Sequence, residues 1–131
     1  MQFISKNVLV DCAHNPSGIE VLRKELEMIK NKRKINNFIF VIGIQETKDI
    51  PNILNTISPL VSTIIFTKSG NEKASTPQEL SKIFNKINNE KPITTKIMDS
   101  QKKALSFARK IADKNDLVVV TGSIYLVGEI I

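Results

Sequence analysis

Short apolar runs alternate along this chain with stretches whose apolar residues recur at helical spacing. Strands are expected at residues 8–10, 38–42, 63–66, 93–98 and 117–120, and each is followed by a helical pattern or, after the last strand, by a capped tail. Strands that are apolar on both sides fit a mostly parallel sheet covered by helices on both faces. The alternation therefore predicts an α/β, three-layer domain with a mostly parallel sheet of about six strands.

Helix starts are marked by residues that cap helices well. Asn15-Pro16 and Thr76-Pro77 each combine an N-cap with proline at the first helical position. The helix after Thr76 is expected to carry the apolar residues Leu80, Ile83, Phe84 and Ile87. A further helix is expected to begin near Asp49, and another at Asp99 or Ser100. The tail 121–131 is ambiguous, because β-branched residues favour a strand while Ser123 favours a helix start. We expect a helix, cut short at Ile131.

Length and composition predict one domain, residues 1–131, without linkers or repeats. No apolar run approaches the roughly 18 to 20 residues of a membrane helix. The lone Cys12 supports no disulfide, so a cytoplasmic protein without a membrane partner is expected. The net charge of +6 comes mainly from Lys, with few aromatic residues, so nucleic acid is not expected as a partner. The basic cluster 30–34 suits the solvated end of a helix.

One turn concentrates polar chemistry where the first strand passes into a helix. Asp11, His14 and the adjoining Asn15 follow that strand directly. Open helix amides attract phosphate or carboxylate, Asp can hold an ammonium or a ribose hydroxyl, and His can exchange a proton. The alternative is purely structural: Asp11 and Asn15 cap the helix and His14 bonds a backbone carbonyl. Both interpretations remain open on spacing alone.

Gly122-Ser123 repeats this arrangement after the last strand, where the hydroxyl could bind a carboxylate or serve as an ordinary cap. Because carboxyl ends of parallel strands share one sheet edge, the two turns could meet at one ligand. The loop 43–49, with Lys48 and Asp49, lies on the same edge and offers weaker contacts. Glu129 is expected to be a solvated helix residue. Cys12 has no nearby partner with metal-ligand spacing, and no glycine-rich phosphate loop occurs.

Two segments together resemble folylpolyglutamate and dihydrofolate synthases of the Mur ligase superfamily. Residues 11–16, Asp-Cys-Ala-His-Asn-Pro, resemble that family's Asp-Gly-Ala-His-Asn-Pro signature. Residues 121–129, Thr-Gly-Ser-Ile-Tyr-Leu-Val-Gly-Glu, resemble its C-terminal signature. Between them, the strand and loop at 41–49 and the segment 74–80 also have counterparts. Cys12 stands where the family usually has Gly, Thr47 where it often has Asp and Lys73 where Arg is common. The Arg usually found upstream of the first signature has no counterpart before Arg23.

The resemblance implies a Rossmann-like C-terminal domain of an ATP-dependent amide ligase, inactive alone. An ATP-binding domain outside this chain would hold ATP and Mg²⁺, and a folate or pteroate carboxylate would become an acyl phosphate that the amine of L-glutamate attacks. Asp11, His14 and Asn15 would contact glutamate or the nucleotide edge, and Ser123 would hold a glutamate carboxylate. Lys48, Asp49 and Tyr125 are possible loop contacts. No catalytic residue and no metal ligand are assigned in this chain.

Two other functions stay open at this point. The chain could be a non-catalytic binding or interaction module of the same fold, or a ligase domain for a different amino acid. The sequence does not distinguish a folate from a dihydropteroate substrate.

Overall fold

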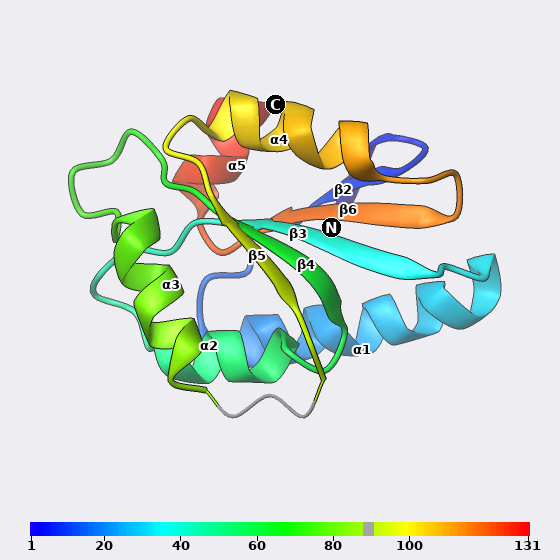
Figure 1. Ribbon diagram of the computed structural model, residues 1–131, viewed down its shortest axis with the longest axis horizontal. Helices are drawn as coiled ribbons and strands as arrows, with labels where there is room; N and C mark the ends of the chain where they lie inside the picture. Colours follow the sequence, from blue (N-terminus) through cyan, green and yellow to red (C-terminus); the bar gives the residue numbers. More distant parts are fainter. Residues whose placement is uncertain (88–90) are drawn as a thin grey trace.

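The computed structural model describes residues 1–87 and 91–131, which form an α/β domain in three layers (Figure 1). The strands are β1 (Gln2–Ser5), β2 (Val8–Val10), β3 (Asn37–Ile42), β4 (Val61–Phe66), β5 (Thr94–Ile97) and β6 (Asp116–Thr121). The helices are α1 (Pro16–Arg33), α2 (Ile50–Ile57), α3 (Pro77–Asn85), α4 (Gln101–Ile111) and α5 (Ile124–Ile130).

In the described part of the chain the strands form one six-stranded sheet with the order β1-β2-β6-β3-β4-β5. All neighbouring pairs are parallel except β1 and β2, which form an antiparallel hairpin. The prediction of a mostly parallel sheet of about six strands is confirmed. β1 was not among the predicted strands, because its residues are too polar and too exposed to form an apolar run. The tail is a helix, as expected.

The core has two halves that follow the period-two alternation of the strands. On β2, Leu9 faces one side, where α1, α2 and α3 cover the sheet. Val8 and Val10 face the other side, beneath α4 and α5. Figure 1 shows these two helical layers below and above the sheet. Each fully buried large aliphatic side chain contributes about 1.5–3 kcal/mol, so the two-sided burial accounts for the nearly all-apolar central strands.

The helix caps follow the local sequence closely. Asn15 Oδ1 accepts a hydrogen bond from Gly18 N at 2.8 Å, and Thr76 Oγ1 accepts one from Glu79 N at 3.1 Å. Of the two candidate caps of α4, the structure selects Ser100. The predicted third helix ends earlier than its apolar spacing suggested, at Asn85, because the N–H of Ile87 bonds to the Phe84 carbonyl in a tighter turn.

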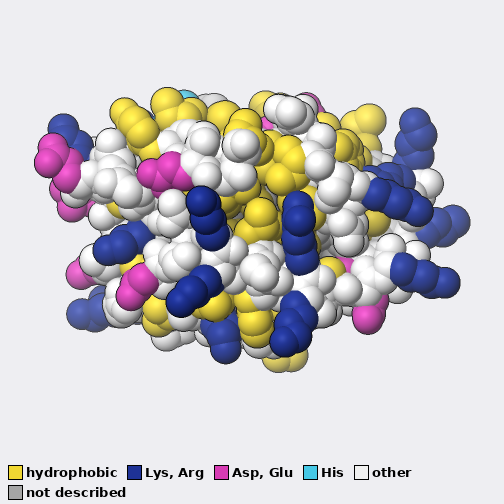
Figure 2. All heavy atoms as spheres, turned by 90° about the horizontal axis from the view of Figure 1, so that it is seen from above, with side chains coloured by type: hydrophobic (Ala, Val, Ile, Leu, Met, Phe, Trp, Pro, Cys, Tyr) yellow, Lys and Arg dark blue, Asp and Glu magenta, His cyan; other side chains and the backbone are white. Residues whose placement is uncertain are grey.

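The surface carries dispersed positive charge. Figure 2 shows Lys and Arg side chains scattered over the face seen from above, with hydrophobic and acidic side chains between them. The basic cluster 30–34 forms the end of α1, where Lys34 adopts a left-handed conformation with φ of 57°. Within residues 1–87 and 91–131, no helix is both long and apolar enough to cross a membrane.

Candidate functional site

The sheet has a topological switch point at the carboxyl ends of β2 and β6. These strands are neighbours, yet the chain leaves β2 for α1 on one face and leaves β6 for α5 on the other. Ligands of open α/β sheets bind at switch points of this kind, outside the carboxyl ends of the strands. The two predicted turns, residues 11–15 and 121–123, follow β2 and β6 and lie at this switch point.

The two turns are joined directly by hydrogen bonds. The N–H of Gly122 donates to the Ala13 carbonyl at 3.1 Å, and the Thr121 hydroxyl donates to the same oxygen at 3.4 Å. The N–H of Asp11 donates to the Val120 carbonyl at 3.0 Å. The structure therefore brings together the turns that the sequence placed on one edge, although 108 residues separate Ala13 from Thr121.

Gly122 is required by the geometry of this junction. Its φ is +106°, and a Cβ atom there would lie 2.5 Å from the Gly43 carbonyl oxygen and 2.9 Å from Ile42 Cγ1. The positive φ alone disfavours other residues. Gly122 thus allows β6 to turn into α5 while its backbone passes closely over the end of β3.

Asp11 uses one of its carboxylate oxygens in a structural role. Oδ1 accepts a hydrogen bond from Ala13 N at 2.8 Å, which shapes the turn. Oδ2 lies 3.3 Å from the amino nitrogen of Met1, and the Asp11 side chain is 17% exposed. That Asp11 contacts a ligand stays a prediction.

His14 and Asn15 both make local contacts. His14 Nδ1 lies 3.0 Å from the Cys12 carbonyl oxygen, and since a carbonyl only accepts, Nδ1 carries the hydrogen. In neutral His14 this leaves Nε2 as an acceptor. The Asn15 oxygen is used by the cap of α1. Asn15 therefore caps α1, and His14 bonds a backbone carbonyl, as the structural alternative predicted. That the second ring nitrogen of His14 contacts a ligand stays a prediction.

Ser123 caps α5 from a buried position. Its hydroxyl oxygen accepts from Tyr125 N at 3.1 Å and from Leu126 N at 3.4 Å, and the residue is 3% exposed. The hydroxyl hydrogen remains as a donor. Tyr125, the next candidate, is 45% exposed beside it. That Ser123 and Tyr125 contact a ligand stays a prediction.

The loop after β3 is connected to the loop after β4. Gln45 forms an isolated bridge with Ala74, and its side-chain amide donates to Asn71 Oδ1 at 3.2 Å. Asp49 caps α2 by accepting from the N–H of Asn52 at 3.4 Å. Lys48 is half-buried in the same loop. Asp49 thus has a structural function, and ligand contacts by Lys48 or Asp49 remain predictions.

The contacts of Glu129 at this edge were not predicted from the sequence. Glu129, expected to be solvated, is exposed, yet its carboxylate accepts hydrogen bonds from Gly70 N and from the Gln101 side chain. Its place at the end of the second signature was the only signal that could have indicated a role.

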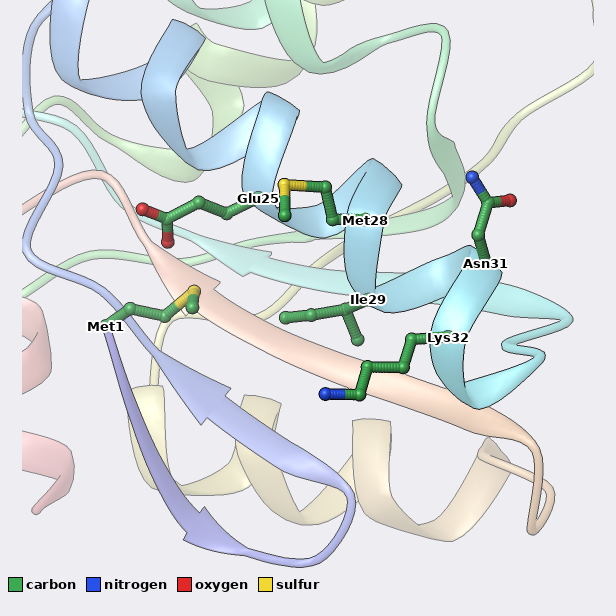
Figure 3. A pocket seen from close by; sticks show the side chains of 6 residues that line it. All are labelled: Met1, Glu25, Met28, Ile29, Asn31 and Lys32. Carbon is green, nitrogen blue, oxygen red and sulfur yellow. The ribbon is translucent and has the colours of Figure 1, made fainter.

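A hollow of about 670 Å³ lies elsewhere, between β1 and the second half of α1 (Figure 3). It is open, and Met1, Met28 and Ile29 make its lining largely apolar, with Glu25, Asn31 and Lys32 at its sides. None of the predicted site residues lines it.

Neither shifted pKa values nor clusters of metal-ligating side chains indicate a second site within the described residues. Among them, only Lys91 has a clearly shifted pKa, which partial burial and the neighbouring Lys30 lower. Its ammonium donates to the Pro59 carbonyl at 2.7 Å, before the start of β5 and not at the carboxyl edge. No group of three His, Cys, Asp or Glu side chains in residues 1–87 and 91–131 is placed to hold a metal ion.

The fold is an α/β domain of the doubly wound class, with two polar strand-to-helix turns joined at the carboxyl edge of its sheet. The chain belongs to the family described as dihydrofolate synthetase, C-terminal domain, whose model matches residues 3–131. The resemblance to folylpolyglutamate and dihydrofolate synthases is thereby confirmed.

Known relatives agree with this family and are much longer proteins. A protein of Haloferax volcanii named "Probable bifunctional folylpolyglutamate synthase/dihydropteroate synthase" is 27% identical over 122 residues, which are 93% of this chain and 14% of that protein. A UDP-N-acetylmuramoyl-L-alanyl-D-glutamate--2,6-diaminopimelate ligase of Buchnera aphidicola is 30% identical over 122 residues, 88% of this chain and 22% of the ligase. The structure of E. coli FolC in complex with DHPP and ADP matches with a TM-score of 0.85 and 25% identity, over 98% of this chain and 29% of that one.

Proposed function

We propose that this chain is the amino-acid-binding C-terminal domain of an ATP-dependent amide ligase that adds L-glutamate to a folate or dihydropteroate. The observation that carries the proposal is the direct junction of the Asp11 and Ser123 turns at the switch point. It occurs in a chain that belongs to the dihydrofolate synthetase C-terminal family. A bifunctional folylpolyglutamate synthase/dihydrofolate synthase of this fold has been solved with Mn, AMPPNP and L-glutamate bound.

The turn residues match the two charges of an amino acid. Asp11, whose side chain is 17% exposed, would hold the amine of glutamate through Oδ2. The Ser123 hydroxyl would donate to a carboxylate, and His14 Nε2 would accept a hydrogen bond from the amine or the nucleotide edge. The amine, once its ammonium group has lost a proton to solvent, attacks the carbonyl carbon of the acyl phosphate, and inorganic phosphate leaves as the amide bond forms. Holding the two reactants together makes this bimolecular attack effectively unimolecular, so the domain contributes chiefly through positioning.

ATP and Mg²⁺ would be held by an ATP-binding domain of the same ligase. The described residues of this chain offer no cluster of metal ligands, and the sequence has no phosphate loop, so they do not fit either group by themselves. Formation of the acyl phosphate is therefore assigned to that other domain. The folate or pteroate, like glutamate, would meet this chain at the carboxyl edge of the sheet. We place such a ligase in the cytoplasm.

The direct test is a titration of the isotope-labelled chain with L-glutamate, followed by amide NMR. We expect shifts at the backbone amides of residues 11–15 and 121–126, and a weaker response in D11N and S123A. Shifts elsewhere, or none up to millimolar L-glutamate, would refute the assigned site. D-Glutamate and L-alanine serve as ligand controls, since each lacks part of the predicted complementarity.

Ligation itself can be tested by complementation. The ATP-binding part of E. coli FolC, prepared without its own C-terminal domain, is mixed with this chain, ATP, Mg²⁺, dihydropteroate and L-glutamate. Product formation above that of either part alone supports the ligase function. If this chain binds L-glutamate but forms no product, even with an ATP-binding domain from the same ligase, the non-catalytic binding module is favoured instead.

A second candidate is a ligase domain for a diaminopimelate-type amino acid, favoured by the 30% identity to the Buchnera ligase. The same NMR titration distinguishes the two candidates. If meso-diaminopimelate causes larger amide shifts than L-glutamate, the proposed substrate changes to a diaminopimelate-type amino acid, and the proposed site stays the same.

A further inference from the structure

The carboxylate of Glu129 joins three segments that are far apart in the sequence. Both of its oxygens lie 2.9 Å from the backbone nitrogen of Gly70, in the loop after β4. Its Oε1 also accepts from Gln101 Nε2 at 3.0 Å, at the first residue of α4. We call this set, Gly70, Gln101 and Glu129, the edge clamp. It lies at the end of α5 opposite the Ser123 turn.

Helix α5 is held in place by packing as well as by the edge clamp. It contains Gly128, whose backbone freedom weakens a helix by about 0.5–1 kcal/mol relative to Ala. Leu126 and Val127 supply the buried contacts, and Leu126 Cδ2 would lie 3.2 Å from a Cβ on Gly43, over the end of β3. α5 therefore extends from β6 over the end of β3 towards the loop after β4.

The Glu129 carboxylate does not serve helix α5 itself. A carboxylate only accepts hydrogen bonds, and both of its oxygens accept from other segments. Hydrogen bonds to a charged acceptor are stronger than neutral ones, so these contacts can fix the position of the helix.

We infer that Glu129 is a positioning residue for the switch-point site. By fixing the far end of α5 to the loop after β4 and to α4, it holds the turn that carries Ser123 at the orientation needed for an amino-acid ligand. The inference rests on the proposed function, because without a ligand at the switch point there is nothing to position. Glu129 acts through α5 and does not itself touch the substrate.

The clamp can be broken from either side in the full 131-residue chain. E129A removes the acceptor, and E129D keeps the charge but shortens the reach by one methylene. G70A acts from the other side, because its Cβ would lie 2.9 Å from Glu129 Oε2 and displace the carboxylate. E129Q keeps an oxygen for the Gly70 amide. E25A removes a carboxylate from α1, on the opposite face, and is the matched control.

The first measurement is hydrogen exchange of the amides in the loop after β4, without ligand. We expect faster exchange at Gly70 in E129A and E129D, and slow exchange in wild type, E129Q and E25A. The second is the Kd for L-glutamate from the NMR titration. E129A, E129D and G70A should each raise Kd about fivefold, the factor that corresponds to the net contribution of one typical hydrogen bond. E129Q and E25A should leave it within about twofold.

The outcomes separate this inference from the proposed function. If wild type does not bind L-glutamate, the proposed function fails, and the positioning role fails with it. If wild type binds and E129A binds equally well, the proposed function stands and the positioning role is refuted. If E129Q loses affinity as much as E129A while its Gly70 amide exchanges as slowly as in wild type, the clamp is intact and the lost charge acts on the ligand, which overturns positioning through the clamp. An unchanged urea midpoint in E129A confirms that a change in Kd is not caused by unfolding.

Discussion

Replacing Gly122 by alanine should destabilise the domain far more than any other glycine-to-alanine change at this edge. The φ of +106° forces an L-residue into a disfavoured conformation, at a cost of about 1–2 kcal/mol. The new Cβ would also lie 2.5 Å from the Gly43 carbonyl oxygen, and relieving such an overlap between backbone segments costs about 1–3 kcal/mol. The sum, about 2–5 kcal/mol, is a large part of the roughly 5–15 kcal/mol that stabilises a typical domain.

The assay is urea unfolding followed by circular dichroism, with Gly128 as the matched control. Gly128 lies in α5, and a Cβ there would meet no atom within 4 Å. G128A should therefore be neutral or stabilising by about 0.5–1 kcal/mol, through better helix propensity. G122A should lower the urea midpoint with little change in m, or fail to fold. A G122A protein within about 1 kcal/mol of wild type would refute the assigned backbone geometry, given the magnitudes above.

Three other substitutions separate stability from ligand binding. S123A should cost about 1 kcal/mol through loss of the α5 cap and should also weaken the NMR response to L-glutamate. T76A, which removes the corresponding cap of α3, should cost a similar amount by urea unfolding and leave the glutamate response intact; equal ligand effects in both would assign Ser123 a purely structural role. D116A should cost about 1–3 kcal/mol, because the buried carboxylate accepts from Asn37 Nδ2 at 3.1 Å and Asp113 N at 2.9 Å. Its glutamate affinity should be unchanged, since Asp116 begins β6 at the opposite end of the strand from the site; a changed Kd measured by titration would contradict that separation.

Local signals in the sequence were sufficient for most of the helix starts. A cap and the amide it binds are three residues apart at Asn15 and Thr76, so the sequence contains both partners of the interaction. The apolar strands were equally visible, because burial on two faces leaves little room for polar residues. The end of α3 was placed too late, since the spacing of Ile83 and Ile87 is compatible with either a helix or a tighter final turn.

The candidate site was predicted only in part. The turns at Asp11 and Ser123 could be assigned to one sheet edge, because parallel strands share their carboxyl ends. Their direct junction required β6 to enter the sheet between β2 and β3, an arrangement that no local pattern encodes. Glu129 looked like a solvated residue because its partners, Gly70 and Gln101, are 59 and 28 residues away.

Local residue patterns were enough to predict the helices, the strands β2 to β6 in their order, and the two polar turns, since each depends on residues within a few positions of one another. The pairing of β1 with β2, the place of β6 beside β2 at the switch point, and the contacts of Glu129 with Gly70 and Gln101 became visible only in the tertiary structure. These features depend on contacts between distant segments, whose partners are chosen by packing of the whole sheet.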